Sequence, residues 1–128
     1  MMKKRKVEWV YLILNHEKRM VKIGYTADLS TRIRQIELSS GTELELIFAA
    51  LIDSYYELPA KDIESHLHER CKKKRGIGEW FKLNHYDVIG CVMYLKSLNT
   101  NKILHGIFDS WYPVCKKNSA QKSYLCTA

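Results

Sequence analysis

Two apolar segments with a polar break between them open the chain. Residues 8–14 are apolar at nearly every position, and residues 20–25 form a second run of residues that favour strands. The polar segment 15–19 is longer than a two-residue turn. The pattern therefore predicts a β-hairpin with a long turn. Apolar side chains on both faces of the first strand predict a central strand that is covered on both sides.

Three later segments have the spacing of amphipathic helices, with apolar residues three or four positions apart. Each follows a residue that commonly starts a helix, and Gly41 marks the end of the first. The predicted helices start at Asp28, Pro59 and Asn84, and their buried faces are Leu29, Ile33 and Ile36; Ile63, Leu67 and Cys71; and Val88, Cys91, Val92 and Leu95.

A third apolar run at residues 44–52 completes the strands that the pattern predicts, and residues 80–83 form a short extended segment. The expected fold is α/β, with a small three-stranded, mostly antiparallel sheet flanked by helices. Residues 103–112 are apolar enough to dock a C-terminal helical extension onto the domain.

These elements divide the chain into three parts. Residues 1–7 form a basic arm, residues 8–98 the folded domain, and residues 99–128 an extension that is partly docked and ends in a polar, disordered segment. A chain of 128 residues is long enough for one domain with a modest core.

The net charge of +7 and the pI near 9.2 narrow the class of partner. A basic surface attracts polyanions, chiefly nucleic acid, although solvated charge that only aids solubility explains either basic cluster taken alone. The clusters are residues 3–6 and the candidate phosphate contacts Arg70, Lys72, Lys73, Lys74 and Arg75.

The sequence also bears on location and redox state. No apolar run approaches the roughly 18 residues of a membrane helix, and no export signal is visible. We therefore expect a cytoplasmic protein that is not attached to a membrane. Its four cysteines lack paired C-x-x-C spacing, so we expect reduced thiols and no zinc site.

Arg32 lies on the flank of the first helix's apolar face, three residues from Leu29 and four from Ile36. A guanidinium group at the edge of a core needs an anion, because it cannot lose its charge at accessible pH. Position alone favours an ion pair with a nearby carboxylate; a bound phosphate is the alternative.

Four pieces of sequence, in this order and spacing, resemble the GIY-YIG nuclease superfamily, and within it the short stand-alone branch found in phages and bacteria. The resemblance covers roughly residues 8–83. The pieces are Val10-Tyr11 and Lys22-Ile23-Gly24 in the two hairpin strands, Arg32 in the first helix, the acidic helix segment 62–68, and Gly78-Glu79-Trp80-Phe81.

The resemblance implies a metal-dependent endonuclease that hydrolyses DNA phosphodiester bonds. Glu64 would hold Mg²⁺ or Mn²⁺, Tyr11 would lie beside the attacking water, and Arg32 would grip the scissile phosphate. His68 would assist, through a hydrogen bond to Glu64 or as a proton carrier. Each residue also has a purely structural reading: Glu64 as a surface glutamate paired with Lys61 or His68, Tyr11 as core, and His68 as a surface histidine.

The sequence departs from the family pattern at two places. Lys22 stands where the second tripeptide usually has tyrosine, and we expect it to contact phosphate instead. Many members have an asparagine after the acidic helix, and here Glu79 and Asn84 are both candidates for that position.

Two other functions remain open at the level of sequence. The same fold could bind nucleic acid through its basic surface without cutting it, which the change at Lys22 favours. A basic, phage-type protein could instead block an acidic host factor.

Overall fold

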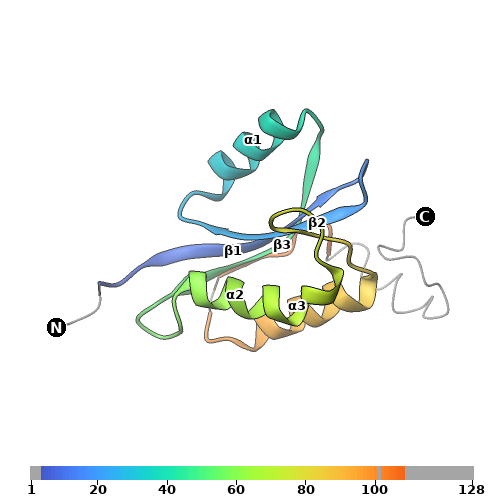
Figure 1. The fold of residues 1–128 in the computed structure, drawn as a ribbon. Coiled ribbons are helices and arrows are strands. Elements are labelled where there is room, and N and C mark those ends of the chain that lie inside the picture. The colour runs from blue at the N-terminus through green and yellow to red at the C-terminus, as the bar shows by residue number, and fades with distance from the viewer. Residues whose placement is uncertain (1–3, 101, 109–128) are drawn as a thin grey trace.

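The computed structural model describes residues 4–100 and 102–108 of the chain. Within these residues the centre of the fold is a five-stranded antiparallel sheet with the strand order β4-β2-β1-β3-β5. Figure 1 shows the long strands β1, β2 and β3 crossing the middle of the molecule. The strands are β1 (Val7–Asn15), β2 (Met20–Thr26), β3 (Leu44–Asp53), β4 (Trp80–Phe81) and β5 (Ile103–Leu104).

Helices cover both faces of this sheet (Figure 1). Helix α1 (Leu29–Ser40) lies on one face, and α2 (Ala60–Arg70) and α3 (His85–Ser97) lie on the other. β1 is accordingly buried on both sides, as its apolar pattern predicts. Val10, Leu12 and Leu14 pack toward α2 and α3, whereas Tyr11 and Ile13 pack toward α1.

Local signals place the helix ends where the sequence predicts them. The Asp28 side chain accepts a hydrogen bond from the Thr31 amide at the start of α1. Gly41 ends that helix in the left-handed conformation, with φ of 71°, which glycine adopts without steric cost. Asn84 and Asp87 form a reciprocal capping box at the start of α3. No helix in the described ranges is long and apolar enough to cross a membrane.

The α/β class is confirmed, but the prediction of three strands is wrong. β4 and β5 add one two-residue strand to each edge of the sheet, by pairing with β2 and β3. Two residues are too few to show the alternation that identifies a strand in sequence. The C-terminal extension, which the sequence predicts to be helical, therefore contains a strand at residues 103–104. Phe108 is buried in the core, and residues 109–112 lie outside the described residues.

The basic arm is tied to the domain over the part that the structure describes. Arg5 forms an ion pair with Asp53, at the end of β3. Lys6 accepts a hydrogen bond from the Ser54 amide at 2.9 Å, and its own amide donates to Ser54 Oγ at 2.7 Å. Residues 5 and 6 thus extend the pairing of β1 with β3 beyond Val7.

The register of the central hairpin places Tyr11 opposite Gly24 on β2 and opposite Ala49 on β3. The Tyr11 ring lies directly over Gly24: a Cβ atom built there would fall 2.5 Å from Tyr11 Cζ. Only glycine leaves room for the ring at this position. The β1–β2 pairing therefore fixes where the tyrosine hydroxyl points.

Candidate active site

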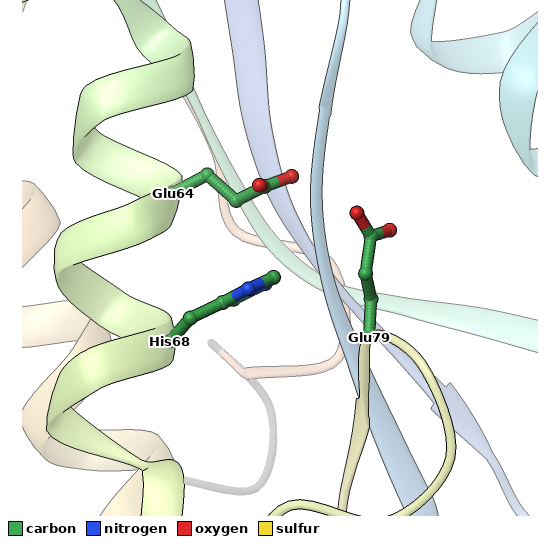
Figure 2. Close-up of side chains that lie close together, drawn as sticks. All are labelled: Glu64, His68 and Glu79. Carbon is green, nitrogen blue, oxygen red and sulfur yellow. The ribbon is translucent and has the colours of Figure 1, made fainter.

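Glu64, His68 and Glu79 converge beside strand β2, as Figure 2 shows. Each offers one ligand atom, and these atoms all lie within 4.8 Å of one another. Glu64 and His68 are one helical turn apart on α2, so they share a side of the helix. Ile63 and Leu67, the residues just before them, are buried in the core and fix that side toward the sheet. Glu79 approaches from the loop before β4.

The loop carrying Glu79 is positioned by its pairing with β2. β4 pairs with Val21 and Lys22, and the Ile23 amide then donates to the Glu79 carbonyl at 3.2 Å. Past that bond, toward Thr26, the described strands include no partner for this edge of β2. The side chains of the cluster therefore meet at an open sheet edge, which a substrate can approach.

His68 is held by a hydrogen bond to the main chain. Its Nε2 lies 2.8 Å from the carbonyl oxygen of Ile23, and because a carbonyl oxygen only accepts, Nε2 carries the hydrogen. In the neutral ring Nδ1 then keeps a free lone pair. Hydrogen bonds of this kind orient metal-binding histidines and fix their tautomer. The ring also contacts Phe81, with 5.0 Å between ring centroids.

Glu64 is buried, with 8% of its surface exposed, so it is not a surface glutamate paired with Lys61. Burial raises the pKa of its carboxyl group to about 7, and the nearby Glu79 carboxylate adds to the rise. Lys22, Arg75 and Lys61 oppose the shift without cancelling it. Two carboxylates facing each other in a half-buried site are short of positive charge.

Lys22 supplies part of that charge. Its side chain is nearly buried, forms an ion pair with Glu79 at 3.1 Å, and lies over the Trp80 ring. The direct pairing of Lys22 with Trp80 between β2 and β4 brings the lysine to the carboxylate. The sequence predicts that Lys22 contacts phosphate, whereas in the structure it is paired with the Glu79 carboxylate.

The structure also separates the two candidates for the family's asparagine position. Glu79 lies in the cluster, whereas Asn84 caps α3 through its hydrogen bond with the Asp87 amide at 2.8 Å. Glu79 is therefore the residue that joins the site. From the sequence it is only one of two candidates, because nothing local distinguishes a loop glutamate at a site from one in solvent.

Tyr11 and Arg32 lie close together on the α1 side of the sheet. Burial raises the pKa of the Tyr11 phenol, and a hydrogen bond with Arg32 acts in the opposite direction. The charges of Glu79 and Glu64 also raise this pKa, which places the hydroxyl near both carboxylates. The phenol is consequently protonated at neutral pH.

Arg32 makes no ion pair with a carboxylate among the described residues. It is half-buried, and its Nη1 donates to Gln35 Oε1 at 3.4 Å. The ion pair that its position favours is thus not formed. A partly buried guanidinium with only neutral partners has capacity for an external anion.

The donor set fits a divalent cation. Two carboxylates and an imidazole suit Mn²⁺, and the carboxylates alone suit Mg²⁺. Ligand atoms on opposite sides of such an ion stand about 4.2 Å apart. The ligand atoms of the cluster, all within 4.8 Å of one another, are therefore close to the spacing that such an ion needs. A cation would also offset the repulsion that raises the pKa of Glu64.

The predicted phosphate contacts at residues 70–75, at the end of α2 and just after it, are engaged in different ways. Lys72 pairs with Glu69, and Lys74 pairs with Asp87 at 3.0 Å. Arg70 lies against α3, where its Nη2 would meet a Cβ atom on Gly90 at 2.9 Å. Lys73 is exposed and has no ion pair in the described part of the chain.

Arg75 is the member of this set nearest the cluster. Its charge lowers the pKa of Glu64, and its Nε donates to the Gly78 carbonyl at 2.7 Å. The hydrogen bond holds the guanidinium against the loop that carries Glu79. The structure therefore brings Arg75 and Lys22 to the site and leaves Arg70 outside it.

Comparisons with known proteins match the chain to a family model. Searches of curated proteins and of solved structures found no match. The model of the T5orf172 domain, a phage-associated domain related to nuclease-like folds, matches residues 8–96, well over half of the chain and including every residue of the cluster. The chain therefore belongs to the T5orf172 domain family.

Proposed function

We propose that the protein is a metal-dependent endonuclease of the GIY-YIG type that hydrolyses DNA phosphodiester bonds. The observation that supports this most directly is the convergence of Glu64, His68 and Glu79 at an open sheet edge beside Tyr11 and Arg32. Acidic, imidazole, phenol and guanidinium groups in one place can bind a cation, a water molecule and a phosphate.

Glu64 and Glu79 would hold Mg²⁺ or Mn²⁺, with His68 Nδ1 as a third donor. The cation would neutralise charge that develops on the phosphate. Lys22 keeps Glu79 directed at the site through its ion pair. The remaining steps depend on groups of the chain itself.

Tyr11 would orient the attacking water. Because its pKa is raised, the phenol is neutral at pH 7 and can donate one hydrogen bond while accepting another. As the water oxygen attacks phosphorus and the bond to the leaving oxygen breaks, the phenol would accept the water proton and give up its own to the Glu79 carboxylate, whose charge acts on it. The Tyr11 ring cannot swing away, since β2 and the ring's contact with Gly24 confine it.

Arg32 would bind the scissile phosphate with its planar set of donors. Its hydrogen bonds to Tyr11 and Gln35 orient it and leave further N–H groups for the ligand. Lys73 and Arg75 would contact the neighbouring backbone, which positions DNA without reading its sequence. We expect a cytoplasmic site of action.

A cleavage assay tests the proposal. Supercoiled plasmid is incubated with the protein in Mg²⁺, Mn²⁺ or EDTA, and nicking is followed on a gel. We expect cleavage with either metal and none in EDTA. Glu64→Gln and Arg32→Ala should each lose about a hundredfold in rate or more, because each removes charge from the reacting centre.

Glu69→Gln is the matched control, since Glu69 lies on the same helix but is exposed and pairs with Lys72. It should cut like the wild type. Circular dichroism and thermal melting verify that every variant is folded. Metal-independent cutting, or full activity in Glu64→Gln, would show that the assignment of the site is wrong.

A second candidate is a nucleic-acid-binding module that does not cut. The ion pair between Lys22 and Glu79 favours it, because the site then contains an internal cation that partly replaces a metal. This function predicts DNA binding that is equal in Mg²⁺ and EDTA and unchanged in Glu64→Gln, with no product in the plasmid assay.

A further inference from the structure

A hollow lies where residues 4–6 meet the loop between β3 and α2. Figure 1 shows that this loop and the start of β1 lie at the same end of the molecule. The volume of the hollow is about 840 Å³, enough for one or two nucleotides. Basic residues border it on one side and an exposed apolar loop on the other. The side chains that matter are Lys4, Arg5, Lys6, Tyr55, Tyr56 and Leu58.

Several hydrogen bonds hold this loop in shape. Asp53, paired with Arg5, accepts from the Tyr55 amide at 2.9 Å, and its carbonyl accepts from the Tyr56 amide at 3.0 Å. Ser54 is joined to Lys6 by the two hydrogen bonds described above. These bonds hold the backbone of residues 53–56 against residues 5 and 6 before any ligand arrives, which lowers the cost of ordering the loop on binding.

Neither tyrosine ring packs into the hydrophobic core. Tyr55 is 73% exposed and Tyr56 61%, and Leu58 beside them is also exposed. The rings contact each other edge to face, with 4.8 Å between centroids, which keeps their outer faces in solvent. Exposed aromatic faces beside lysine ammonium groups are the combination that binds single-stranded nucleic acid: bases stack on the rings while the phosphates meet the cations.

The hollow is close to the candidate active site along the chain. Pro59 lines it, and Glu64 comes five residues later on α2, about 7.5 Å along the helix axis at 1.5 Å per residue. Two or three stacked nucleotides at about 3.4 Å each cover that distance. A DNA strand that reaches the site can therefore continue along α2 toward the hollow.

We propose that this hollow binds unpaired bases of a DNA strand, stacked on Tyr55 and Tyr56 with their phosphates on Lys4 and Lys6. The identity of the polymer rests on the proposed function; the preference for unpaired bases is new. It makes the substrate a DNA with a single-stranded segment next to the cut, such as a tail or a flap.

Binding is tested first, in EDTA so that cleavage plays no part. Fluorescence anisotropy follows a labelled 15-nucleotide oligo(dT) and a labelled blunt duplex. Tyr55→Ala/Tyr56→Ala should weaken oligo(dT) binding about tenfold or more, because base–aromatic stacking is lost, and change duplex binding less than twofold. Tyr55→Phe/Tyr56→Phe keeps the rings and should bind like the wild type. Tyr86→Ala, at an exposed tyrosine on α3, is the matched control.

Cleavage then compares a blunt duplex with the same duplex bearing a single-stranded tail, in Mn²⁺. The wild type should cut the tailed duplex faster, and the double alanine variant should cut both at the blunt rate. Wild-type oligo(dT) binding by the alanine variant, or equal loss in the phenylalanine variant, would overturn the proposal. If nothing is cut while oligo(dT) binding still depends on the rings, the endonuclease proposal fails and the binding site stands.

Discussion

Glu64 shows how one buried carboxyl group can lower the stability of a fold. Its carboxyl group is buried opposite a second carboxylate, so ionising it costs free energy that the folded chain must supply. A cation or a proton relieves that cost. Without either, the ionised carboxyl group lowers the free energy of unfolding, and the other interactions of the fold must offset that loss.

The stability of the metal-free protein should therefore depend on the pH in a defined window. The pKa of Glu64 is about 7 in the folded protein against 4.5 when unfolded, so the folded state binds more protons between these values. The free energy of unfolding then falls as the pH rises from about 4.5 through about 7. Glu64→Gln should exceed the wild type by less than about 1 kcal/mol at pH 5 and by up to about 3 kcal/mol at pH 8.5.

Urea unfolding in EDTA at the two pH values measures this difference. Glu69→Gln serves as the control, since the ion pair with Lys72 lowers the pKa of Glu69 and places its titration below this window. If the stability difference between Glu64→Gln and wild type is the same at both pH values, Glu64 does not titrate as described.

Among the elements, the β1–β2 hairpin does most to build the site. It places Tyr11 opposite Gly24, and the same strand β2 carries Lys22 and the Ile23 carbonyl that binds His68. A shift of one residue in register would turn all of these groups to the other face. The hairpin thus specifies the tyrosine, the lysine and the orientation of the histidine together.

Gly24→Ala tests this arrangement. The added methyl group would fall 2.5 Å from Tyr11 Cζ, so the buried ring must move. We expect a loss of about 1–3 kcal/mol in the free energy of unfolding, as for other overpacked cores, together with loss of cleavage in the soluble, folded variant. Denaturant unfolding and the plasmid assay measure the two effects.

The double variant Tyr11→Leu/Gly24→Ala separates the contact from a general effect on the strand. With the ring absent, Gly24→Ala should cost clearly less stability than it does in the wild type. Equal costs in the two backgrounds would mean that the ring does not confine residue 24.

At the scale of the whole molecule, the basic residues behind the net charge of +7 differ in whether they are available to bind DNA. Lys72, Lys74 and Arg5 are each paired with a carboxylate of the protein. Lys73 has no such pair in the described ranges, so it can exchange counterions for DNA phosphates at full effect. Net charge alone does not reveal this difference.

The salt dependence of DNA binding should reveal whether Lys73 contacts DNA. For duplex DNA without divalent metal, Lys73→Gln should reduce the slope of log affinity against log salt concentration by about 1. Lys96→Gln removes the same charge on α3, where Lys96 lies over Phe108, and should leave the slope unchanged. Equal slopes for wild type and Lys73→Gln would exclude Lys73 from the DNA interface.

The sequence by itself determined the elements that depend on near neighbours. Helices and long strands follow from apolar spacing within a few residues, and Asp28, Gly41 and Asn84 mark helix ends through bonds to adjacent amides. Four site residues came from the resemblance, which places Tyr11, Arg32, Glu64 and His68 by order and spacing; their catalytic roles stay predictions.

Only the tertiary structure decided which groups meet. Glu79 lies near Glu64 because β4 pairs with β2, and a two-residue strand leaves no periodic signal in the sequence. The same pairing turns Lys22 toward Glu79. The exposed tyrosines gain their basic neighbours because β1 and β3 bring residues 4–6 to residues 54–59. Contacts between distant residues depend on strand register, which local patterns do not contain.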